Sequence, residues 1–430
     1  MKRMGRWLTL IGVAALVGGW AGAQTLEKLS LADAEKIAVQ NHPQIQSAID
    51  VAAAAKAQVT QARAAYYPTA YGSLTGVDAE NNSRIAAGAL NNPIIYERYA
   101  NGFTLNQLVT DFGRTHELVK SSNLRAQAEQ ERVVATRADV LLGVDRSFFV
   151  SLRAQAVLGV AQETVKDRQL IADQITELER NKIRSGLDVS FANVDLAQAQ
   201  LLLVQAQNDL DTSYAQLSAA LGYGDERTFE LTDEPTPPAP PANYSDLLAQ
   251  AIRNRPELIG MRLDVASAQT YATAERDLSF PTISAAGVAG LTPFGVDQLG
   301  PRYAAAGFNV NIPIFNGHLF GALRSEASAQ ARAEDQNLRG LQNGIVRDVR
   351  MAWLNANSAY QKLSITDMLL KSATDALDLA QSRYKLGLSS IIELSQAQLN
   401  LTQAELQAAS AKYDYQTALS DMNYQIGALH

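Results

Sequence analysis

Residues 114–185 read RTHELVKSSNLRAQAEQERVVATRADVLLGVDRSFFVSLRAQAVLGVAQETVKDRQLIADQITELERNKIRS. This stretch contains no proline, and no proline occurs anywhere between Pro93 and Pro235. Because a proline inside a helix costs about 3 kcal/mol, so long a gap is a strong helix signal. At about 1.5 Å per residue, one helix over these 72 residues would be a rod roughly 108 Å long. The rest of the chain is expected to be organised around this rod.

Apolar residues inside the stretch recur at the spacing of one helix face. Leu141, Val144, Phe148 and Leu152 follow one another at intervals of three, four and four residues. Side chains at that spacing form a stripe along a helix. We therefore expect the long helix to pack side by side with other helices.

Gly186 is expected to mark the point where the chain turns back. A glycine just past a helix end readily adopts the left-handed conformation that closes the last turn. The run that follows, 188–221, has 34 residues and covers only about half of the long helix. A run of 35 residues, 30–64, is predicted to complete the other half. Two shorter helices stacked end to end would then match one long helix.

Bulk composition narrows the possible function. The chain has 430 residues, a formal net charge of −7 and no cysteine. The negative charge speaks against nucleic acid as a partner, and the lack of cysteine excludes disulfides, thiolate metal sites and lipid attachment at a cysteine. No long apolar stretch follows the first two dozen residues. That excludes a transmembrane helix but leaves a transmembrane β-barrel open.

The N-terminus reads as a secretory signal peptide over residues 1–23. Lys2, Arg3 and Arg6 precede an apolar core from Trp7 to Trp20, and small residues follow at 21–23. A membrane anchor is the alternative, but the core is shorter than the roughly 20 residues that a span requires. We therefore expect the mature protein to be exported and to begin at Gln24.

The sequence is internally duplicated. Ala38, Asn41 and Pro43 recur 213 positions later as Ala251, Asn254 and Pro256. Further matches are Gly113 with Gly317, Leu141, Val144 and Phe148 with Val346, Val349 and Trp353, Gly186-Leu187 with Gly387-Leu388, and Leu221-Gly222 with Ile426-Gly427. The first repeat accordingly spans 24–232 and the second 243–430. The second contains a long helix over 318–386 and a return helix over 388–426.

A proline-rich segment, DEPTPPAPPA at 233–242, joins the two repeats. Such a composition favours an extended conformation. We interpret the segment as a spacer that carries the chain back to the start of the second repeat. A clasp or docking segment is the alternative.

Each repeat carries a predicted pair of strands between its first helix and its long helix, at about 66–111 and about 280–315. The pattern is clearest where Phe308, Val310, Ile312 and Ile314 alternate with polar residues or proline. The individual strands are expected at 67–77, 99–109, 283–291 and 308–314, with loops at 79–98 and 292–302. Each is close to the roughly 9–11 residues of a tilted membrane strand. Four strands cannot close a barrel, so three chains would supply twelve.

The combined order resembles the TolC-like outer-membrane efflux proteins. It consists of helix, Asn-x-x-Pro-like turn, Pro-initiated strand pair, Phe-Gly or Phe-Asn-Gly turn, very long helix, Gly-Leu tip and return helix, all duplicated, and it covers essentially the whole mature chain. The resemblance implies a mainly α fold with a small β part. It further implies a homotrimer with a twelve-stranded β-barrel in outer-membrane lipid, continued by an α-helical barrel through the periplasm. The helix tips would meet a periplasmic adaptor protein and, through it, an inner-membrane transporter.

The resemblance also implies which residues act at the tips. The docking residues are expected to be Gly186 and Leu187 in the first repeat and Gly387, Leu388 and Ser389 in the second. A plain turn between two antiparallel helices, without a docking role, is the alternative.

The tunnel constriction is expected at Tyr384, Glu393 and Gln396. Family members tend to carry two acidic residues six and nine positions beyond the second tip glycine, whereas here only Glu393 is acidic. Three copies of Glu393 around a threefold axis would still concentrate negative potential. The alternative is a solvated carboxylate with no role in conduction.

No catalytic or metal-binding pattern stands out. Asp111-Phe112-Gly113 spells a kinase magnesium motif, but the Gly-rich loop and the His-Arg-Asp segment of kinases are missing, so we assign it to a strand-to-helix turn. The four histidines, His42, His116, His318 and His430, lack metal-ligand spacing. We therefore expect neither an enzyme nor a cofactor.

The sequence thus favours a passive outer-membrane exit duct of a tripartite efflux pump or a type I secretion system, exporting small molecules or proteins. Two alternatives belong to other classes. One is a soluble periplasmic coiled-coil adaptor, and the other is an independent outer-membrane porin or adhesin.

Overall fold

The structure is a computed structural model that describes residues 27–80, 96–295 and 300–429. The expected signal peptide and most of the predicted loop 79–98 lie outside these residues. The first repeat contains β1 (Glu27–Leu29), α1 (Leu31–Asn41), α2 (Pro43–Arg63), the 3-10 turn η1 (Ala64–Tyr66), β2 (Thr69–Val77), β3 (Arg98–Thr110), α3 (Arg114–Arg180), α4 (Gly186–Ala220) and β4 (Phe229–Leu231). The second contains α5 (Tyr244–Asn254), α6 (Pro256–Asp277), β5 (Thr282–Gly295), β6 (Arg302–Asn311), α7 (Leu319–Lys385) and α8 (Ile391–Gln425).

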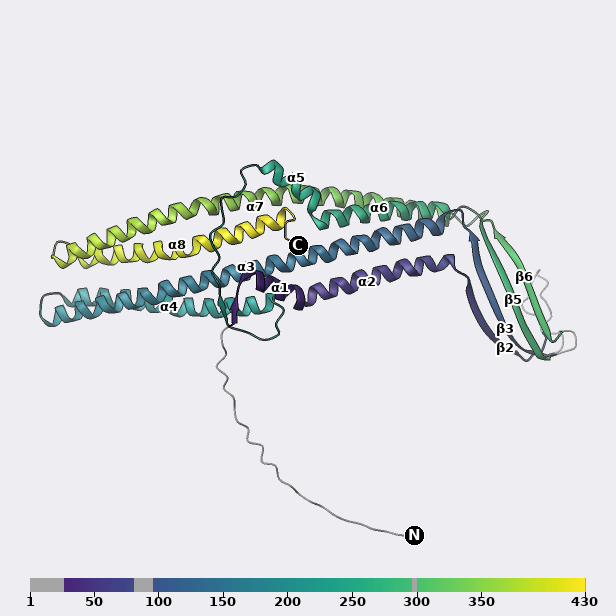
Figure 1. The fold of residues 1–430 in the computed structure, drawn as a ribbon, viewed down its shortest axis with the longest axis horizontal. Coiled ribbons are helices and arrows are strands. Elements are labelled where there is room, and N and C mark those ends of the chain that lie inside the picture. Colours follow the sequence, from purple (N-terminus) through teal and green to yellow (C-terminus); the bar gives the residue numbers. More distant parts are fainter. Residues whose placement is uncertain (1–26, 81–95, 296–299, 430) are drawn as a thin grey trace, which may run out of the picture.

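Two continuous helices, α3 and α7, run most of the length of the body (Figure 1), and each has 67 residues. Helices α2 and α4 lie end to end along α3, and α6 and α8 lie end to end along α7 (Figure 1). Helix α3 packs against α8 in one half and against α6 in the other, which makes one layer of four columns. The predicted stacking of shorter helices beside a longer one therefore describes both repeats.

The apolar stripe of α3 lies where the stacked helices meet. Val144 and Phe148 are fully buried, in a core that includes Leu217 of α4 and Ala38 of α1. The predicted stripe is therefore a packing surface, and it holds the middle of the molecule together.

The predicted N-terminal helix over 30–64 is broken into α1 and α2 at His42. A residue before proline is disfavoured in the helical region, and His42, which precedes Pro43, is extended with φ −72° and ψ 122°. Its Nδ1 accepts the N–H of Gln44 at 3.3 Å, so it caps α2. Arg255, which precedes Pro256, breaks the second repeat in the same way.

One register relates the repeats from the start of the long helix onward. Helices α3 and α7 begin 205 residues apart, and so do α4 and α8. The predicted match of Gly113 with Gly317 is therefore wrong by one residue. The counterpart of Gly113 is His318, and both have left-handed backbone, with φ of 111° and 69°.

Four strands form an antiparallel sheet in the order β2-β3-β5-β6, and β1 and β4 form a separate parallel pair. Strand β5 extends to Gly295, into the predicted loop 292–302, and β6 ends at Asn311, before the predicted strand end. Paired residues share a face of a sheet, so the register separates two faces. One face carries Leu74, Phe103, Leu105, Leu291, Phe308 and Val310, and the other carries Thr69, Ser73, Thr104, Asn106, Ser284 and Asn309.

The proline-rich linker 233–242 is held against α8 and then α7. Side chains of these helices bind it along its length: Lys412 to Asp233 at 2.6 Å, Gln416 to the carbonyl oxygen of Glu234 at 3.3 Å, Tyr415 to that of Pro238, and the Trp353 indole N–H to that of Pro241 at 2.8 Å. A spacer alone does not account for these contacts. The linker therefore also binds along the second helical hairpin, which α7 and α8 form.

Two glycines close the junctions between stacked helices. Gly222 (φ +83°) follows α4, and a Cβ on it would lie 3.0 Å from the carbonyl oxygen of Asn41 at the end of α1. Gly427 (φ +69°) follows α8 and would meet the backbone of Asn254 at 3.0 Å. The matched Leu-Gly and Ile-Gly pairs of the sequence thus mark the same junction in both repeats.

Gly222→Ala is expected to lower the free energy of unfolding by roughly 1–3 kcal/mol, because the new Cβ meets backbone and the left-handed conformation is strained. Thermal unfolding of the purified protein measures the change. Gly143→Ala is the control, since an added Cβ at this helical position has no non-local neighbour within 4 Å and alanine favours helix by up to about 1 kcal/mol. Equal unfolding temperatures for the two variants would contradict the argument.

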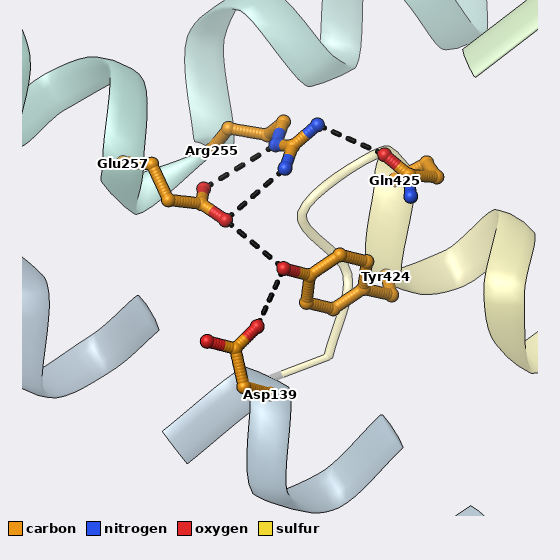
Figure 2. A network of polar contacts seen from close by, with 5 residues as sticks. All are labelled: Asp139, Arg255, Glu257, Tyr424 and Gln425. Atoms are coloured by element: carbon orange, nitrogen blue, oxygen red, sulfur yellow. Dashed lines mark hydrogen bonds and ion pairs between the residues drawn. The ribbon is translucent and has the colours of Figure 1, made fainter. Parts of the chain in front are cut away.

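The junction of the second repeat carries an additional polar network (Figure 2). The buried Arg255 donates to both carboxylate oxygens of Glu257, at 3.1 and 3.3 Å, and to Oε1 of Gln425 at 2.9 Å. The Tyr424 hydroxyl contacts Glu257 at 3.2 Å and donates to Asp139 at 2.5 Å. The start of α6, the end of α8 and the middle of α3 are thereby joined.

A carboxyl group is also buried where α3 passes α1 and α8. Burial, assisted by the nearby Glu35 and Asp421 and opposed by a hydrogen bond with Ser420, raises the pKa of Asp145 to about 7. The folded protein therefore holds this proton more tightly than the unfolded chain does. The stability that this supplies is fully present below about pH 3.8, the ordinary pKa of an aspartate, and is lost as pH rises from there to about 7.

Asp145→Asn is expected to remove this loss, because the amide stays neutral at every pH. At pH 8 the variant should be the more stable protein by on the order of 2–4 kcal/mol, with a smaller difference at pH 5. Thermal unfolding of both proteins at the two pH values tests this. The same difference at pH 5 and pH 8 would rule out titration of Asp145 as its cause.

Candidate functional site at the helix tips

The turns α3–α4 and α7–α8 lie at the same end of the molecule, far from the sheet (Figure 1). Both turns close in the same way. In the first, the N–H of Ile183 donates to the carbonyl oxygen of Leu178 at 2.9 Å, and in the second, the N–H of Leu388 donates to that of Arg383 at 2.9 Å. This six-to-one bond is the Schellman ending of a helix. The two tips are therefore equivalent structures.

The equivalence corrects one predicted match. The left-handed residue is Gly387 (φ 73°) in the second tip but Lys182 (φ 59°) in the first. Gly186 is instead the first residue of α4, and Ser185 caps that helix. The match of Gly186 with Gly387 is thus wrong by four residues, although the constant separation of 205 would have found Lys182. A lysine can stand there because one left-handed residue costs only roughly 1–2 kcal/mol.

Four apolar side chains protrude at the tips. They are Ile183 of the first turn, Leu187 at the start of α4, and Leu386 and Leu388 of the second turn, and each is between 63% and 75% exposed. We call these four residues the tip patch. Exposed apolar residues that gather at one end of a protein are typical of a protein contact surface. Leu187 and Leu388 were expected from the sequence, whereas Ile183 and Leu386 were not.

Ser389, also expected at the docking surface, is only partly exposed. Its hydroxyl oxygen is buried and has no hydrogen-bond partner among the described residues. Gly186 and Gly387 are exposed, and a Cβ at either would meet no neighbouring atom within 4 Å. Both glycines therefore leave open space at the tips.

Tyr384 lies between the two hairpins. Its side chain is covered by Arg184 of the first tip, whose guanidinium carbon is 4.0 Å from the ring centroid. The same guanidinium donates to the Tyr384 carbonyl oxygen at 2.5 Å. Burial and the nearby charge of Asp188 raise the pKa of Tyr384, although the charge of Arg184 lowers it in part. The ring therefore keeps its hydroxyl proton. This contact joins the two tips directly.

Glu393 and Gln396, expected at the constriction, are exposed on the first turns of α8. The Glu393 carboxylate is 3.0 Å from the Arg383 guanidinium. The backbone N–H of Glu393 donates to the hydroxyl oxygen of Ser390, the N-cap of α8, at 3.4 Å. Gln396 donates to Asn400 at 3.0 Å. Asp188 is the counterpart of Glu393 in α4 and completes a capping box with Ser185. An acidic residue at this position therefore also serves helix capping.

A family model described as outer membrane efflux protein matches residues 36–223 and 247–428. The chain belongs to the outer membrane efflux protein family. The resemblance found in the sequence is thereby confirmed. The protein is accordingly an outer-membrane channel that serves as an exit duct for efflux or secretion.

Relatives of this efflux protein cover most of its length. Outer membrane protein TolC of Salmonella enteritidis is 24% identical over 358 residues, which span 77% of this chain and 72% of TolC. Alkaline protease secretion protein AprF of Pseudomonas aeruginosa is 23% identical over 415 residues, or 93% of this chain and 85% of AprF. The crystal structure of the Campylobacter jejuni CmeC outer membrane channel has the same fold, with a TM-score of 0.79 at 17% identity over 93% of this chain and 85% of CmeC.

Further polar contacts hold the two hairpins of this efflux protein together above the tips. The buried Arg168 of α3 donates to the carbonyl oxygen of Gln398 at 2.9 Å and to the Thr402 hydroxyl at 3.1 Å. Ser395 of α8 donates to Asp195 of α4 at 2.5 Å. Sequence reasoning missed these pairs, because their members are 200 or more residues apart and follow no local spacing.

In the part of the chain that the structure describes, no helix is long and apolar enough to cross a membrane.

The Asp111-Phe112-Gly113 motif closes the turn into α3. The Asp111 carboxylate accepts the N–H of Thr115 at 2.7 Å and that of Gly113 at 3.2 Å. The motif is thus a helix cap.

Proposed function

We propose that this protein is the exit duct of a tripartite efflux pump or type I secretion system, working passively as a homotrimer. The observation that carries the proposal is that, within the described residues, the sheet has two open edges and the layer of helices has no further helix beyond either of its two outer columns. Partners would supply the energy and select the cargo.

The sheet edges support a trimer. Within the described residues, β2 and β6 each pair on one side only. In lipid, each unpaired N–H or C=O group at such an edge costs several kcal/mol. If β6 of one chain pairs with β2 of the next, three chains give a closed barrel of twelve strands and no edge remains. The apolar face with Phe103 and Phe308 would then face lipid and the polar face would line the lumen.

Aromatic residues occur at both ends of the sheet. Tyr99 and Phe294 are paired near the loop end, with ring centroids 6.4 Å apart. Phe112 and Phe280 lie near the helix end, with centroids 6.2 Å apart. Girdles of aromatic residues at the two membrane interfaces are a feature of outer-membrane barrels. This arrangement supports a sheet that spans the outer membrane, with the helices in the periplasm.

The outer helix columns support the same assembly. Leu201 and Val204 of α4 are exposed on one edge of the layer, and Ile365 and Met368 of α7 are exposed on the other. In a ring, α7 of one chain would cover α4 of the next. The exposed apolar side chains would thereby be buried in a helical tunnel continuous with the barrel.

The tip patch supports docking of a periplasmic adaptor protein. It lies at the end of the molecule opposite the sheet, where a duct anchored in the outer membrane would approach the inner-membrane transporter. The name of AprF refers to secretion of a protease, so secretion of proteins and efflux of small molecules both stand as roles for this chain.

Native mass spectrometry of the detergent-extracted protein tests the assembly. The expected species is a trimer, and a stable monomer would contradict the proposal. Two further observations separate the alternatives. Release from cells without detergent would favour a soluble adaptor. Transport that persists after deletion of the inner-membrane partner would favour an independent porin.

Ion selectivity tests the proposed constriction. If three copies of Glu393 line the narrow end, Glu393→Gln is expected to lower cation preference in single-channel recordings, and Glu393→Lys is expected to lower it further or reverse it. Arg383→Gln is the matched control, because it frees the Glu393 carboxylate from its ion pair and should raise cation preference. Unchanged selectivity in all three variants would place Glu393 away from the lumen.

A further inference from the structure

A cavity of about 500 Å³ lies next to the tips, on the side toward the middle of the molecule. Residues of α3, α7, α8 and the first tip line it, among them the apolar Ile175, Leu377 and Leu394. Cavities of roughly 300–1,000 Å³ with apolar walls and a few polar groups are typical of sites for small organic molecules. The size and the lining therefore fit a ligand site that joins both hairpins.

Two buried polar atoms at the tip end of this cavity lack partners. Tyr384 and Arg184 both line the cavity, and the Tyr384 hydroxyl and Nε of Arg184 are buried and make no hydrogen bond within the described residues. The Tyr384 side chain belongs to a residue that is only 6% exposed. A buried donor left without an acceptor costs roughly 1–3 kcal/mol. Two such donors at one cavity end point to an acceptor that the described residues do not supply.

The charges along the cavity differ between its ends. Arg184 and Lys385 lie at the tip end. Asp167 and Glu405 line the cavity together with Arg168, which lies twelve residues before the end of α3, or roughly 18 Å along that helix. An anionic group is therefore favoured at the tip end and disfavoured at the far end, so an elongated anion would bind in one orientation.

We propose that the cavity binds an amphipathic organic anion, with its apolar body between α3 and α7 and its anionic group at Tyr384 and Arg184. The anion satisfies both unpartnered donors and displaces water from the apolar walls. Because the ligand contacts both hairpins, it also holds the tips together. This last step rests on the proposed channel function, whereas binding itself does not.

Binding is measured on the full-length mature trimer in lipid nanodiscs, by the fluorescence of three probes with one apolar body. These are 1-pyrenebutyrate, 1-pyrenebutanol and 1-pyrenebutylamine, and protein-free nanodiscs correct for partition into lipid. We expect saturable binding of the butyrate, at least about tenfold tighter than that of the alcohol, since charge-assisted hydrogen bonds are roughly twice as strong as neutral ones. The amine is expected to bind most weakly.

Three variants locate the site. Arg184→Gln is expected to weaken butyrate binding about tenfold, and Tyr384→Phe several-fold. Gln381→Trp places a ring in the cavity from its rim, leaves Tyr384 and Arg184 in place, and should abolish binding. Arg180→Gln is the matched control, because Arg180 lies at the same helix end, pairs with Glu177 at 2.5 Å and should leave the affinity unchanged.

Equal affinity for the three probes would overturn the proposal, since it would indicate an apolar groove suited to a partner helix. So would a butyrate affinity that survives both Arg184→Gln and Gln381→Trp. In planar bilayers, the butyrate should lower the open fraction of the wild-type channel several-fold and act less on Arg184→Gln. Saturable binding without this effect would leave the site in place and remove only its link to the tips.

Discussion

Gly387→Trp is expected to abolish export while the trimer reaches the outer membrane in normal amounts. The left-handed conformation at this position costs a non-glycine residue roughly 1–2 kcal/mol, which is small beside the packing of two helices of 67 residues. A Cβ at Gly387 meets no other residue within 4 Å, so the indole would project from the tip into open space. Between Leu386 and Leu388, it would hold an adaptor away from the tip patch.

Gly387→Ala is the matched control for Gly387→Trp. It carries the same backbone strain without the bulk, so it should export normally. The equivalent change in the first tip is Lys182→Trp, since Lys182 is the left-handed residue there. Gly186→Trp lies at the start of α4 and should act less severely. Export is measured beside the abundance of trimer for each variant. Full export by Gly387→Trp would remove the tip from the docking surface, and loss of trimer would assign the glycine a structural role only.

The helical part of the fold could be predicted because its signals are repeated along the chain. The proline-free stretch and the stripe through Val144 and Phe148 indicated the long helix, and the duplication then located α7. The break at His42 was missed, although Pro43 was visible, because residues 30–64 were assigned to one helix from the length of the run, which matches the remaining half of the long helix. The backbone geometry of the residue before proline decided the break.

The candidate site could be predicted only in part. Glycine marked the second tip, but Lys182 in the first tip carries no local signal, because a lysine in left-handed conformation is uncommon and is tolerated only where the surrounding turn fixes it. The contact of Arg184 with Tyr384 joins residues 200 positions apart. One sequence offers no spacing rule for such a pair, so the cavity beside it was beyond sequence reasoning.

The network at the second junction should be among the most important polar contacts for stability. Arg255→Met is expected to lower the free energy of unfolding by about 3–5 kcal/mol, because it leaves the partly buried Glu257 carboxylate without its cation (Figure 2). Although burial opposes ionisation, the hydrogen bonds and charge of Arg255 hold the pKa of Glu257 below its ordinary value. Removal of the arginine takes away the hydrogen bonds and the charge that lower this pKa, so burial then raises the pKa of Glu257.

The decisive comparison is the double variant Arg255→Met, Glu257→Gln, which removes the charge together with its partner. It should recover much of the lost stability, since an apolar or neutral replacement of a whole buried pair is often nearly neutral. Low pH should likewise shrink the deficit of Arg255→Met, because the abandoned carboxylate takes up a proton, and thermal unfolding at pH 4.5 and pH 7.5 measures both effects. The first repeat supports this expectation: His42 stands where the second repeat has Arg255, and it closes the same helix break by capping Gln44 without an ion pair. A double variant as unstable as Arg255→Met at both pH values would show that the packing of the arginine side chain, and not the uncompensated charge of Glu257, determines the stability of this junction.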